Sequence, residues 1–587
     1  MDFDALDPAT PGDFESDPVM RRRTLLIGLP AMAAGGAVVA LGGDWLRRKD
    51  EVTEIGPASA LVLPGKQVWG HMIAHGLPDY ELPENPYGTT RPLDMTAGPW
   101  TPRPRSTGGV TRALASGLTG MQILLFDGLD RGDNFMVEWF TMADPTWVDP
   151  SRADFSVAPC ILPSSPTGTA RMIREYAAAA KDRPSAGRIG SALVIYVYDS
   201  RKLSPAQWTE VRRASQEAGI EVFLIGSLNL SASQTNYRVS AASLDTDRDC
   251  MDAYWLFDDS ASHVWSELLP MLASRQMPFA GGIQPGYSRE TEDNGGYVSP
   301  RGTKQFRAQW EEHLTAGLPW ANIATWNDVV ERSDIKASSD WSTTRQDINA
   351  YYSARFRGVA LPQTTPQLYM TTPDFIVAGK PVEAEALVIN SGPTTVSVGV
   401  RILGADGQQL GPVTVSTIKA GGIGEATTRA MDLIEASHAD RHVRAESTLY
   451  DHDGTPMQRV VSAPILVYRN TVGVTPRMRQ HFYSVPAYKW LQDKVSLTFS
   501  GNPAHGSVQA SVSVVGNARK LRQVEVIQNT RALGARLEVV SATFAAPMTA
   551  HKIVGGEIAQ ASAAGFYVAR VIDESERVAY SDPVYFA

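Results

Sequence analysis

The chain has 587 residues, 43% of them hydrophobic and 20% charged, which is the composition of a folded protein. This length is too great for one hydrophobic core, so about two to four domains are expected. The formal net charge of −9, with no basic cluster beyond the N-terminus, argues against a nucleic-acid partner. The only two cysteines, Cys160 and Cys250, support neither a disulfide framework nor a cysteine-based zinc site.

The N-terminus carries the pattern of an export signal. Residues 1–20 are acidic and proline-containing and are expected to be a disordered lead. Residues 21–46 begin with Arg21-Arg22-Arg23 and continue with apolar and small residues, which indicates a twin-arginine signal or anchor. Ala40-Leu41-Gly42 suits cleavage, whereas Arg47-Arg48-Lys49 soon afterwards suits a retained anchor, so both alternatives stay open. The expected location is secreted or at the cell surface, with membrane association through this segment as the alternative.

Short apolar runs alternate with amphipathic helical stretches from about residue 62 to 362. The runs are expected to be strands at 66–73, 121–126, 155–161, 192–198, 221–226, 253–257, 278–283 and 320–326. Helices are expected at 111–116, 171–181 and 205–218, between consecutive runs.

The clearest unit lies at 192–226. A strand that is apolar along its whole length is followed by Ser204-Pro205, an N-cap and a first-turn proline, and the helix is expected to end at Gly219. The next strand, 221–226, completes a right-handed βαβ unit and therefore a parallel sheet.

Eight such strands predict a (β/α)₈ barrel over residues 62–362. An open doubly wound sheet is the competing fold, but no glycine-rich fingerprint or P-loop follows any strand, which disfavours it.

Two all-β domains are expected after the barrel. Period-two alternation at 396–402 and turns at Asp406-Gly407 and Asp453-Gly454 predict an immunoglobulin-like sandwich over 363–470. Strand-like runs at 495–499, 524–527 and 566–571 predict a second sandwich over 471–587. The predicted fold class is thus a TIM barrel followed by two β-sandwich domains.

Catalytic side chains in such barrels project from the C-terminal ends of the strands. Six acids and one histidine occupy or follow these ends: Asp127, Asp199, Asp258, Asp259, Asp328, Glu331 and His71. Any one of the acids taken alone is more often a helix cap or a loop ion pair.

The last strand differs because it is followed by two acids. Asp328 and Glu331 stand three positions apart, with Trp326 and Asn327 beside them, and an aromatic ring and an amide suit a sugar ring and its hydroxyls. Glycoside hydrolysis requires two carboxyl groups, one to protonate the leaving oxygen and one to act on the opposite face. The pair predicts a glycosidase site.

Three segments of the barrel resemble glycoside hydrolase family 71, the α-1,3-glucanases or mutanases. The segments are Thr325-Trp326-Asn327-Asp328-Val329-Val330-Glu331 with Ile335, Lys66-Gln67-Val68-Trp69-Gly70-His71-Met72, and Ser116-Gly117-Leu118-Thr119-Gly120. Family 99, the endo-α-mannosidases and mannanases, has a similar layout and is the close competitor.

The resemblance implies an inverting endo-hydrolase with Glu331 as general acid and Asp328 as the base, although the two roles could be exchanged. The chain departs from the family where Thr119 replaces an acid and where Asp-Val-Val-Glu replaces Asp-Tyr-Gly-Glu, which puts the substrate in doubt. Asp127 is the candidate to replace the missing acid.

The remaining functional expectations concern contacts and partners. The expected substrate-binding residues are His71, Asp127, Asp199, Asp258, Asp259, Gln284, Tyr287, Trp326 and Asn327. For His71 a buried core histidine is an equal alternative. No metal site and no cofactor are expected, the expected partner is a polysaccharide, and the sequence does not set the oligomeric state. Two competing functions are a hydrolase of the producer's own envelope glycan and a non-catalytic carbohydrate-binding surface protein.

Overall fold

The structure is a computed structural model of the whole chain. It describes residues 63, 65–73, 108–125, 143, 155–228, 250–256, 264–288, 297–329, 331–361, 363–377, 382–430, 442–468, 481–491, 494–500, 508–515, 520–530, 536–549, 554–558 and 565–585. The expected signal or anchor at 21–46 lies outside these residues. Among the described helices none is long and apolar enough to cross a membrane.

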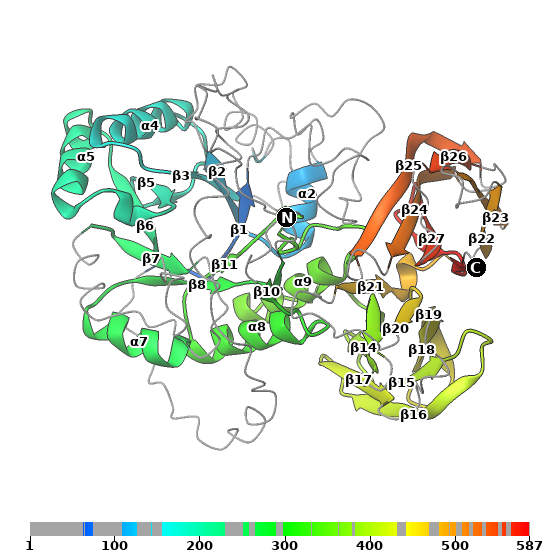
Figure 1. Cartoon of the computed structure of the whole chain (residues 1–587). Helices are drawn as coiled ribbons and strands as arrows, with labels where there is room; N and C mark the ends of the chain where they lie inside the picture. Colours follow the sequence, from blue (N-terminus) through cyan, green and yellow to red (C-terminus); the bar gives the residue numbers. More distant parts are fainter. Residues whose placement is uncertain are drawn as a thin grey trace, which may run out of the picture.

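Eight parallel strands form a closed barrel, which confirms the predicted fold class. In ring order they are β1 (Gln67–Ile73), β2 (Gly120–Leu125), β3 (Ser156–Ile161), β5 (Ala192–Val197), β6 (Val222–Leu228), β7 (Ala253–Leu256), β8 (Phe279–Ile283) and β11 (Trp320–Ile323). The β3–β5 and β11–β1 pairings close the ring, and the short β4 (Arg188–Ile189) adds an antiparallel neighbour to β5. The barrel occupies one side of the molecule and the β domains occupy the other (Figure 1).

Side chains alternate between the barrel interior and the layer under the helices, as the pleat of a strand requires. On β5, Val194 and Tyr196 belong to the interior cluster, whereas Leu193, Ile195 and Val197 belong to the cluster that faces the helices. Both sets are almost fully buried. This two-sided burial explains why the strands are apolar along their whole length.

Two of the helices between strands begin at capping signals of the sequence. In α5 (Pro205–Glu217) the Ser204 hydroxyl and the Gln207 side chain form a capping box, and Ala218 is the C-cap, one residue before Gly219. The helix expected at 171–181 is α4 (Pro166–Ala179), which begins five residues earlier, where Ser165 caps the Gly168 N–H. Ser165-Pro166 is the same signal as Ser204-Pro205, and the sequence analysis missed it.

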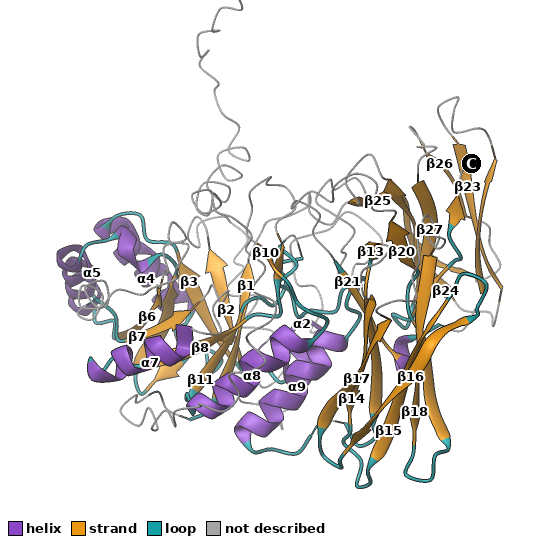
Figure 2. Ribbon diagram, turned by 60° about the horizontal axis from the view of Figure 1, so that its bottom comes forward, coloured by secondary structure: helices purple, strands orange, loops and turns teal. Residues whose placement is uncertain are grey.

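Four further helices of the barrel domain lie in the described part of the chain. They are α2 (Gly108–Ala115), α7 (Val264–Ser274), α8 (Lys304–Ala316) and α9 (Thr344–Arg357). Figure 2 shows α8 and α9 side by side, between the barrel strands and the first β domain. The short β9 (Tyr287–Ser288) and β10 (Tyr297–Val298) form an antiparallel pair after β8.

The first β domain is a sandwich of two sheets. One sheet holds β17 (Ile423–Ala430), β14 (Val382–Ile389), β12 (Gln367–Pro373) and β21 (Phe482–Pro486), and the other holds β13 (Phe375–Val377), β20 (Ile465–Tyr468), β18 (His442–Tyr450), β15 (Val396–Leu403), β16 (Gln409–Ile418) and β19 (Pro456–Val461). An apolar cluster with members from both sheets forms its core. The expected boundary at residue 470 needs correction, because β21 pairs with β12 and so belongs to the first sandwich.

The second β domain also has two sheets around a shared core. One sheet holds β22 (Lys494–Ser500), β23 (Val508–Val515) and β26 (Val554–Ile558), and the other holds β25 (Arg536–Thr549), β24 (Lys520–Thr530), β27 (Gly565–Asp573), β28 (Val578–Tyr580) and β29 (Val584–Tyr585).

The barrel and the first sandwich share an apolar core. Tyr369, Leu387 and Ile389 of the sandwich belong to the same cluster as the barrel residues under α8 and α9. At the edge of this contact Arg307 of α8 lies 3.2 Å from Glu385 of β14, and the Thr303 N–H donates to the same carboxylate. The two domains therefore meet through a continuous hydrophobic contact with a polar margin.

Gly117 precedes β2 in a position that tolerates no side chain. Its φ is +87°, and a Cβ would lie 2.6 Å from the Ser353 Cβ of α9. We expect Gly117→Ala to lower the free energy of unfolding by about 2–4 kcal/mol, because a left-handed backbone and a steric clash add up. Gly454 has φ +83° with nothing within 4 Å of its Cβ position. Gly454→Ala is therefore the control and should lose only about 1 kcal/mol in the same urea titration. Equal losses in the two variants would contradict the clash.

Candidate active site

The segment that follows β11 closes over the C-terminal end of the barrel. We call residues 324–343, between β11 and α9, the β11 loop. Its Ala324 N–H donates to the Ile283 carbonyl of β8 at 2.9 Å, and the Trp326 N–H donates to the His71 carbonyl of β1 at 2.6 Å. The strand itself ends at Ile323, three residues earlier than expected. The loop is thus tied to both neighbouring strand ends.

Asp328 and Glu331 lie in one tight turn of this loop. The Asp328 N–H donates to Thr325 Oγ1 at 2.9 Å, and the Glu331 N–H donates to Asp328 Oδ1 at 2.9 Å. Asp328 is buried, with 4% of its surface exposed, whereas Glu331 is partly exposed. The structure therefore brings the two predicted acids together, with the Asp328 carboxylate held by the turn and the Glu331 carboxylate nearer to solvent.

Tyr287 contacts the second acid directly. Its hydroxyl donates to Glu331 Oε1 at 3.2 Å, and the neighbouring Ser288 N–H donates to the Glu331 carbonyl at 2.8 Å. The sequence analysis expected Tyr287 to bind sugar, and the structure places it on the candidate acid. Strand β9 thus orients Glu331 from the side of β8.

Tyr287→Phe is expected to lower kcat/KM by about tenfold, because the Glu331 carboxyl group loses the hydrogen bond that orients it. Tyr450→Phe, a change of the same kind in the first sandwich, should leave the kinetics unchanged. Steady-state rates on a polysaccharide that the parent protein cleaves compare the two variants. A Tyr287→Phe enzyme as active as the parent would show that the contact is not used.

The barrel interior beneath the β11 loop holds a polar layer. Asn322 Oδ1 accepts from the Tyr196 hydroxyl at 3.0 Å and from Gln122 Nε2 at 3.4 Å, while Asn322 Nδ2 donates to the Gly281 carbonyl at 3.0 Å. His71 is fully buried against the Trp255 ring, 5.4 Å between centroids. Burial lowers the pKa of His71 to about 4, with a side-chain hydrogen bond to Gln122 opposing the shift, so the imidazole is neutral at pH 7. Full burial is what the alternative of a core histidine expects for His71.

Two other predicted residues, Asp199 and Gln284, follow other strands of the barrel. Asp199 follows β5, four strands from β11 in the ring and so on the opposite side of the barrel. It has φ +56°, and its N–H donates to Ser227 Oγ at 2.9 Å. Gln284 is buried after β8, where its N–H donates to Gln309 Oε1 at 2.5 Å. The remaining predicted sites divide between two buried or half-buried loop residues, Trp326 and Asn327, and three residues outside the described part of the chain, Asp127, Asp258 and Asp259.

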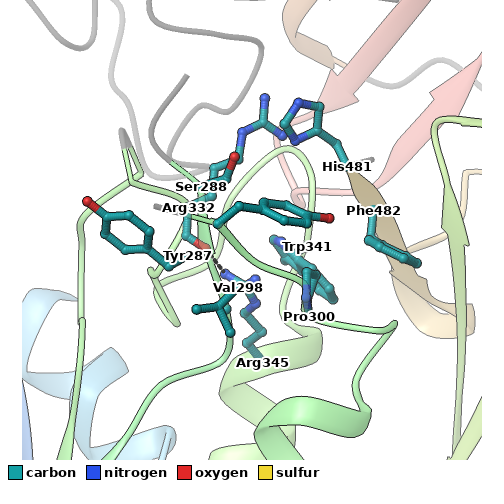
Figure 3. A pocket seen from close by; sticks show the side chains of 11 residues that line it. Tyr287, Ser288, Val298, Pro300, Arg332, Trp341, Arg345, His481 and Phe482 are labelled. Atoms are coloured by element: carbon teal, nitrogen blue, oxygen red, sulfur yellow. Dashed lines mark hydrogen bonds between the residues drawn. The ribbon is translucent and has the colours of Figure 1, made fainter. Parts of the chain in front are cut away.

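A pocket lies beside Tyr287, between the barrel and the first sandwich (Figure 3). It contains about 270 Å³ of empty space, including space open to solvent. It is lined by Gly286, Tyr287, Ser288, Tyr297, Val298, Pro300, Arg332, Trp341, Arg345, His481 and Phe482. The sequence analysis missed most of these residues. His481 and Phe482 come from a different domain, and no local pattern connects them with the barrel.

Buried charges surround the pocket. Arg345 of α9 donates to the carbonyls of Arg332 and Asp334, at 3.0 and 2.6 Å, and its guanidinium lies 3.9 Å from the Trp341 ring centroid. Burial raises the pKa of Asp334 to about 6 against the pull of Arg345. Burial likewise raises the pKa of Asp374 to about 7, with His481 and Arg332 opposing the rise.

The raised pKa of Asp374 predicts a pH dependence of stability. The folded-state pKa of about 7 exceeds the unfolded value of about 3.9. The stability contributed by the protonated Asp374 carboxyl group is therefore fully present below about pH 4, and it is lost as pH rises through about 7. We expect Asp374→Asn to reduce the fall in thermal midpoint between pH 5 and pH 8. The variant keeps an oxygen to accept from the His481 and Phe375 N–H groups, both at 3.0 Å. An unchanged pH slope would show that Asp374 is not the titrating group.

One group of side chains has the spacing of metal ligands. Asp451, His452 and Asp453 lie together at the turn between β18 and β19, largely exposed. This turn is in the first sandwich and is separate from the candidate acids.

Several solved structures are similar to parts of this chain at low identity. No family model matches the chain, and no curated protein matches it. The GH99 endo-alpha-mannosidase of Bacteroides thetaiotaomicron is similar over 50% of this chain and 98% of its own, at 13% identity and a TM-score of 0.42. A beta-glucuronidase of Bacteroides uniformis is similar over 81% of this chain and 59% of its own, at 9% identity and a TM-score of 0.35. An exo-chitosanase of Amycolatopsis orientalis is similar over 82% of this chain and 62% of its own, at 10% identity and a TM-score of 0.27. These structural neighbours are glycoside hydrolases.

Proposed function

We propose that the protein is an exported, endo-acting glycoside hydrolase that cleaves an α-linked polysaccharide with inversion. The observation that carries the proposal is the turn at the end of the last barrel strand, in which Asp328 and Glu331 lie together and Glu331 accepts from the Tyr287 hydroxyl. Two carboxyl groups at the C-terminal face of a barrel supply the acid and the base that glycoside hydrolysis needs.

Glu331 is assigned as the general acid and Asp328 as the base. Glu331 is the more exposed of the two, which suits a group that reaches the leaving oxygen of a long substrate. Asp328 acts on the water at the other face of the sugar ring.

The substrate proposal rests on the sequence. The segment Thr325–Glu331 resembles the α-1,3-glucanases of family 71, and the family 99 layout makes α-mannan the second polymer to test. The N-terminal residues 21–46 support export by the twin-arginine route, which places the substrate outside the cytoplasm. A glycan of the producer's own envelope is the third substrate class.

A digest of α-1,3-glucan and of α-mannan by residues 50–587 tests the proposal. We expect oligosaccharides of mixed length early in the digest, because an endo-acting enzyme cuts within the chain. Proton NMR of the fresh products should show the β anomer first, because inversion of an α linkage produces it. Monosaccharide release alone, or the α anomer first, would contradict the endo or the inverting assignment respectively.

A non-catalytic carbohydrate-binding protein is the alternative of a different class. It predicts binding to one of the polymers without new reducing ends. Affinity electrophoresis in gels that contain each polymer separates this outcome from an inactive preparation.

A further inference from the structure

A chain of buried charges joins the second β domain to the β11 loop. Arg570 of β27 donates from Nε to Glu525 Oε2 of β24 at 2.6 Å and from Nη1 to Asp340 Oδ1 at 3.1 Å. The other oxygen of Asp340 accepts from Arg332 Nη1 at 3.2 Å. Arg332 is the residue directly after Glu331. Arg570, 230 positions after Asp340 in the sequence, is thus connected through Asp340 to Arg332, the neighbour of a candidate catalytic acid.

These charges are deeply buried. Arg570 and Glu525 are fully buried, and Asp340 is 1% exposed. Water cannot replace a lost partner at such a site, so a buried charge keeps its position only through the groups that pair with it. The contact between Arg570 and Asp340 therefore restrains the position of the β11 loop more strongly than a surface ion pair would.

The β11 loop is held from three directions at this point. Arg345 of α9 binds its Arg332 and Asp334 carbonyls, and the Ser484 N–H of β21 donates to the Asp340 carbonyl at 2.7 Å. An apolar cluster at the same junction joins Ala337 of the loop to residues of both β domains, among them Tyr483 and Val568. Arg570 supplies the only one of these polar contacts that comes from the second β domain.

We propose that Arg570 is a positioning residue for the catalytic loop, so that the second β domain is part of the active-site framework rather than a separable module. This inference rests on the proposed function, because it assigns the purpose of the loop to Glu331. The path is short: Arg570 fixes Asp340, Asp340 fixes Arg332, and Arg332 is covalently attached to Glu331. Displacement of a catalytic group by about 1 Å can lower a rate by about 10²-fold.

The test uses the full chain with the variants Arg570→Met, Arg570→Lys and Asp340→Asn. Arg577→Gln is the matched control, because Arg577 also pairs with a buried aspartate of the second β domain, Asp573 at 2.8 Å, in a β27–β28 turn. Two properties are measured for each variant: the kcat and KM on the responsive polymer, and hydrogen exchange of backbone amides in the β11 loop by mass spectrometry.

We expect Arg570→Met and Asp340→Asn to lower kcat by about ten- to a hundredfold with KM within about threefold, and to speed amide exchange in the loop. Arg570→Lys retains the charge and should recover a large part of both properties. Arg577→Gln should leave both at the parent values. If Arg570→Met does not fold, Asp340→Asn and Arg570→Lys, which keep the size or the charge of the site, decide the matter.

Folded Asp340→Asn and Arg570→Met enzymes with either parental kcat or parental loop exchange would overturn the inference. The exchange measurement does not depend on activity. An inactive parent would therefore contradict the proposed function alone, whereas unchanged loop exchange in the variants would contradict the positioning role alone.

Discussion

Glu331→Gln and Asp328→Asn should each lower the hydrolytic rate by about 10³-fold or more while the protein stays folded. Glutamine cannot donate a proton to a leaving oxygen, and asparagine cannot accept one from water, so each variant loses one half of the acid–base pair. Asp328→Asn keeps an oxygen that can accept from the Glu331 N–H, and the turn therefore survives the change of charge. Initial rates on the responsive polymer and circular dichroism of each variant measure the two parts of this prediction.

Two controls accompany these variants. Glu311→Gln on α8 removes a carboxylate that pairs with Arg355 at the surface, and it should retain the parental rate. Asp328→Ala removes the acceptor for the Glu331 N–H as well as the charge, and we expect it to be less stable than Asp328→Asn. Parental activity in either Glu331→Gln or Asp328→Asn would remove that residue from the mechanism.

Arg345→Met should lower the free energy of unfolding by about 3–5 kcal/mol at pH 8, the largest stability effect that we expect. The variant leaves the buried Asp334 without its cation and the Arg332 and Asp334 carbonyls without their donor. At pH 5 the loss should be smaller, because the raised pKa of Asp334, about 6, leaves that carboxyl mostly protonated there.

Arg355→Met on the same helix is the control for this substitution. Arg355 pairs with Glu311 at the surface, where the two side chains are 40% and 49% exposed, and its loss should lower stability by less than about 1 kcal/mol. Urea unfolding followed by tryptophan fluorescence at both pH values compares the two variants. An Arg345→Met protein as stable as Arg355→Met would show that the buried pair does not hold the β11 loop.

The barrel could be predicted from the sequence because burial on both faces makes its strands apolar throughout, as at 192–197 and 222–228. Helix starts are predictable where serine precedes proline, because Ser165 and Ser204 both act as N-caps in front of a first-turn proline. The end of the first sandwich could not be found in this way. Strand β21 joins it through pairing with β12, more than 100 residues earlier, and a local pattern does not record such a partner.

The two acids of the candidate site could be predicted from the sequence, whereas the side chains around them could not. Asp328 and Glu331 follow the last barrel strand, and the rule that places active sites at strand ends locates both. Tyr287 was found as a polar aromatic in a loop, but its contact with Glu331 depends on how β9 lies beside the β11 loop. His481 and Arg570 approach the loop from other domains, and only the folded chain shows that they do.

The most direct test of the account is a reducing-end assay on α-1,3-glucan and α-mannan with the parent protein and Glu331→Gln side by side. The account predicts new reducing ends from at least one polymer with the parent and about a thousandfold fewer with the variant. Equal release by the two proteins, or release from neither polymer, would contradict the assignment of an α-glycan hydrolase that acts through the turn at Asp328 and Glu331.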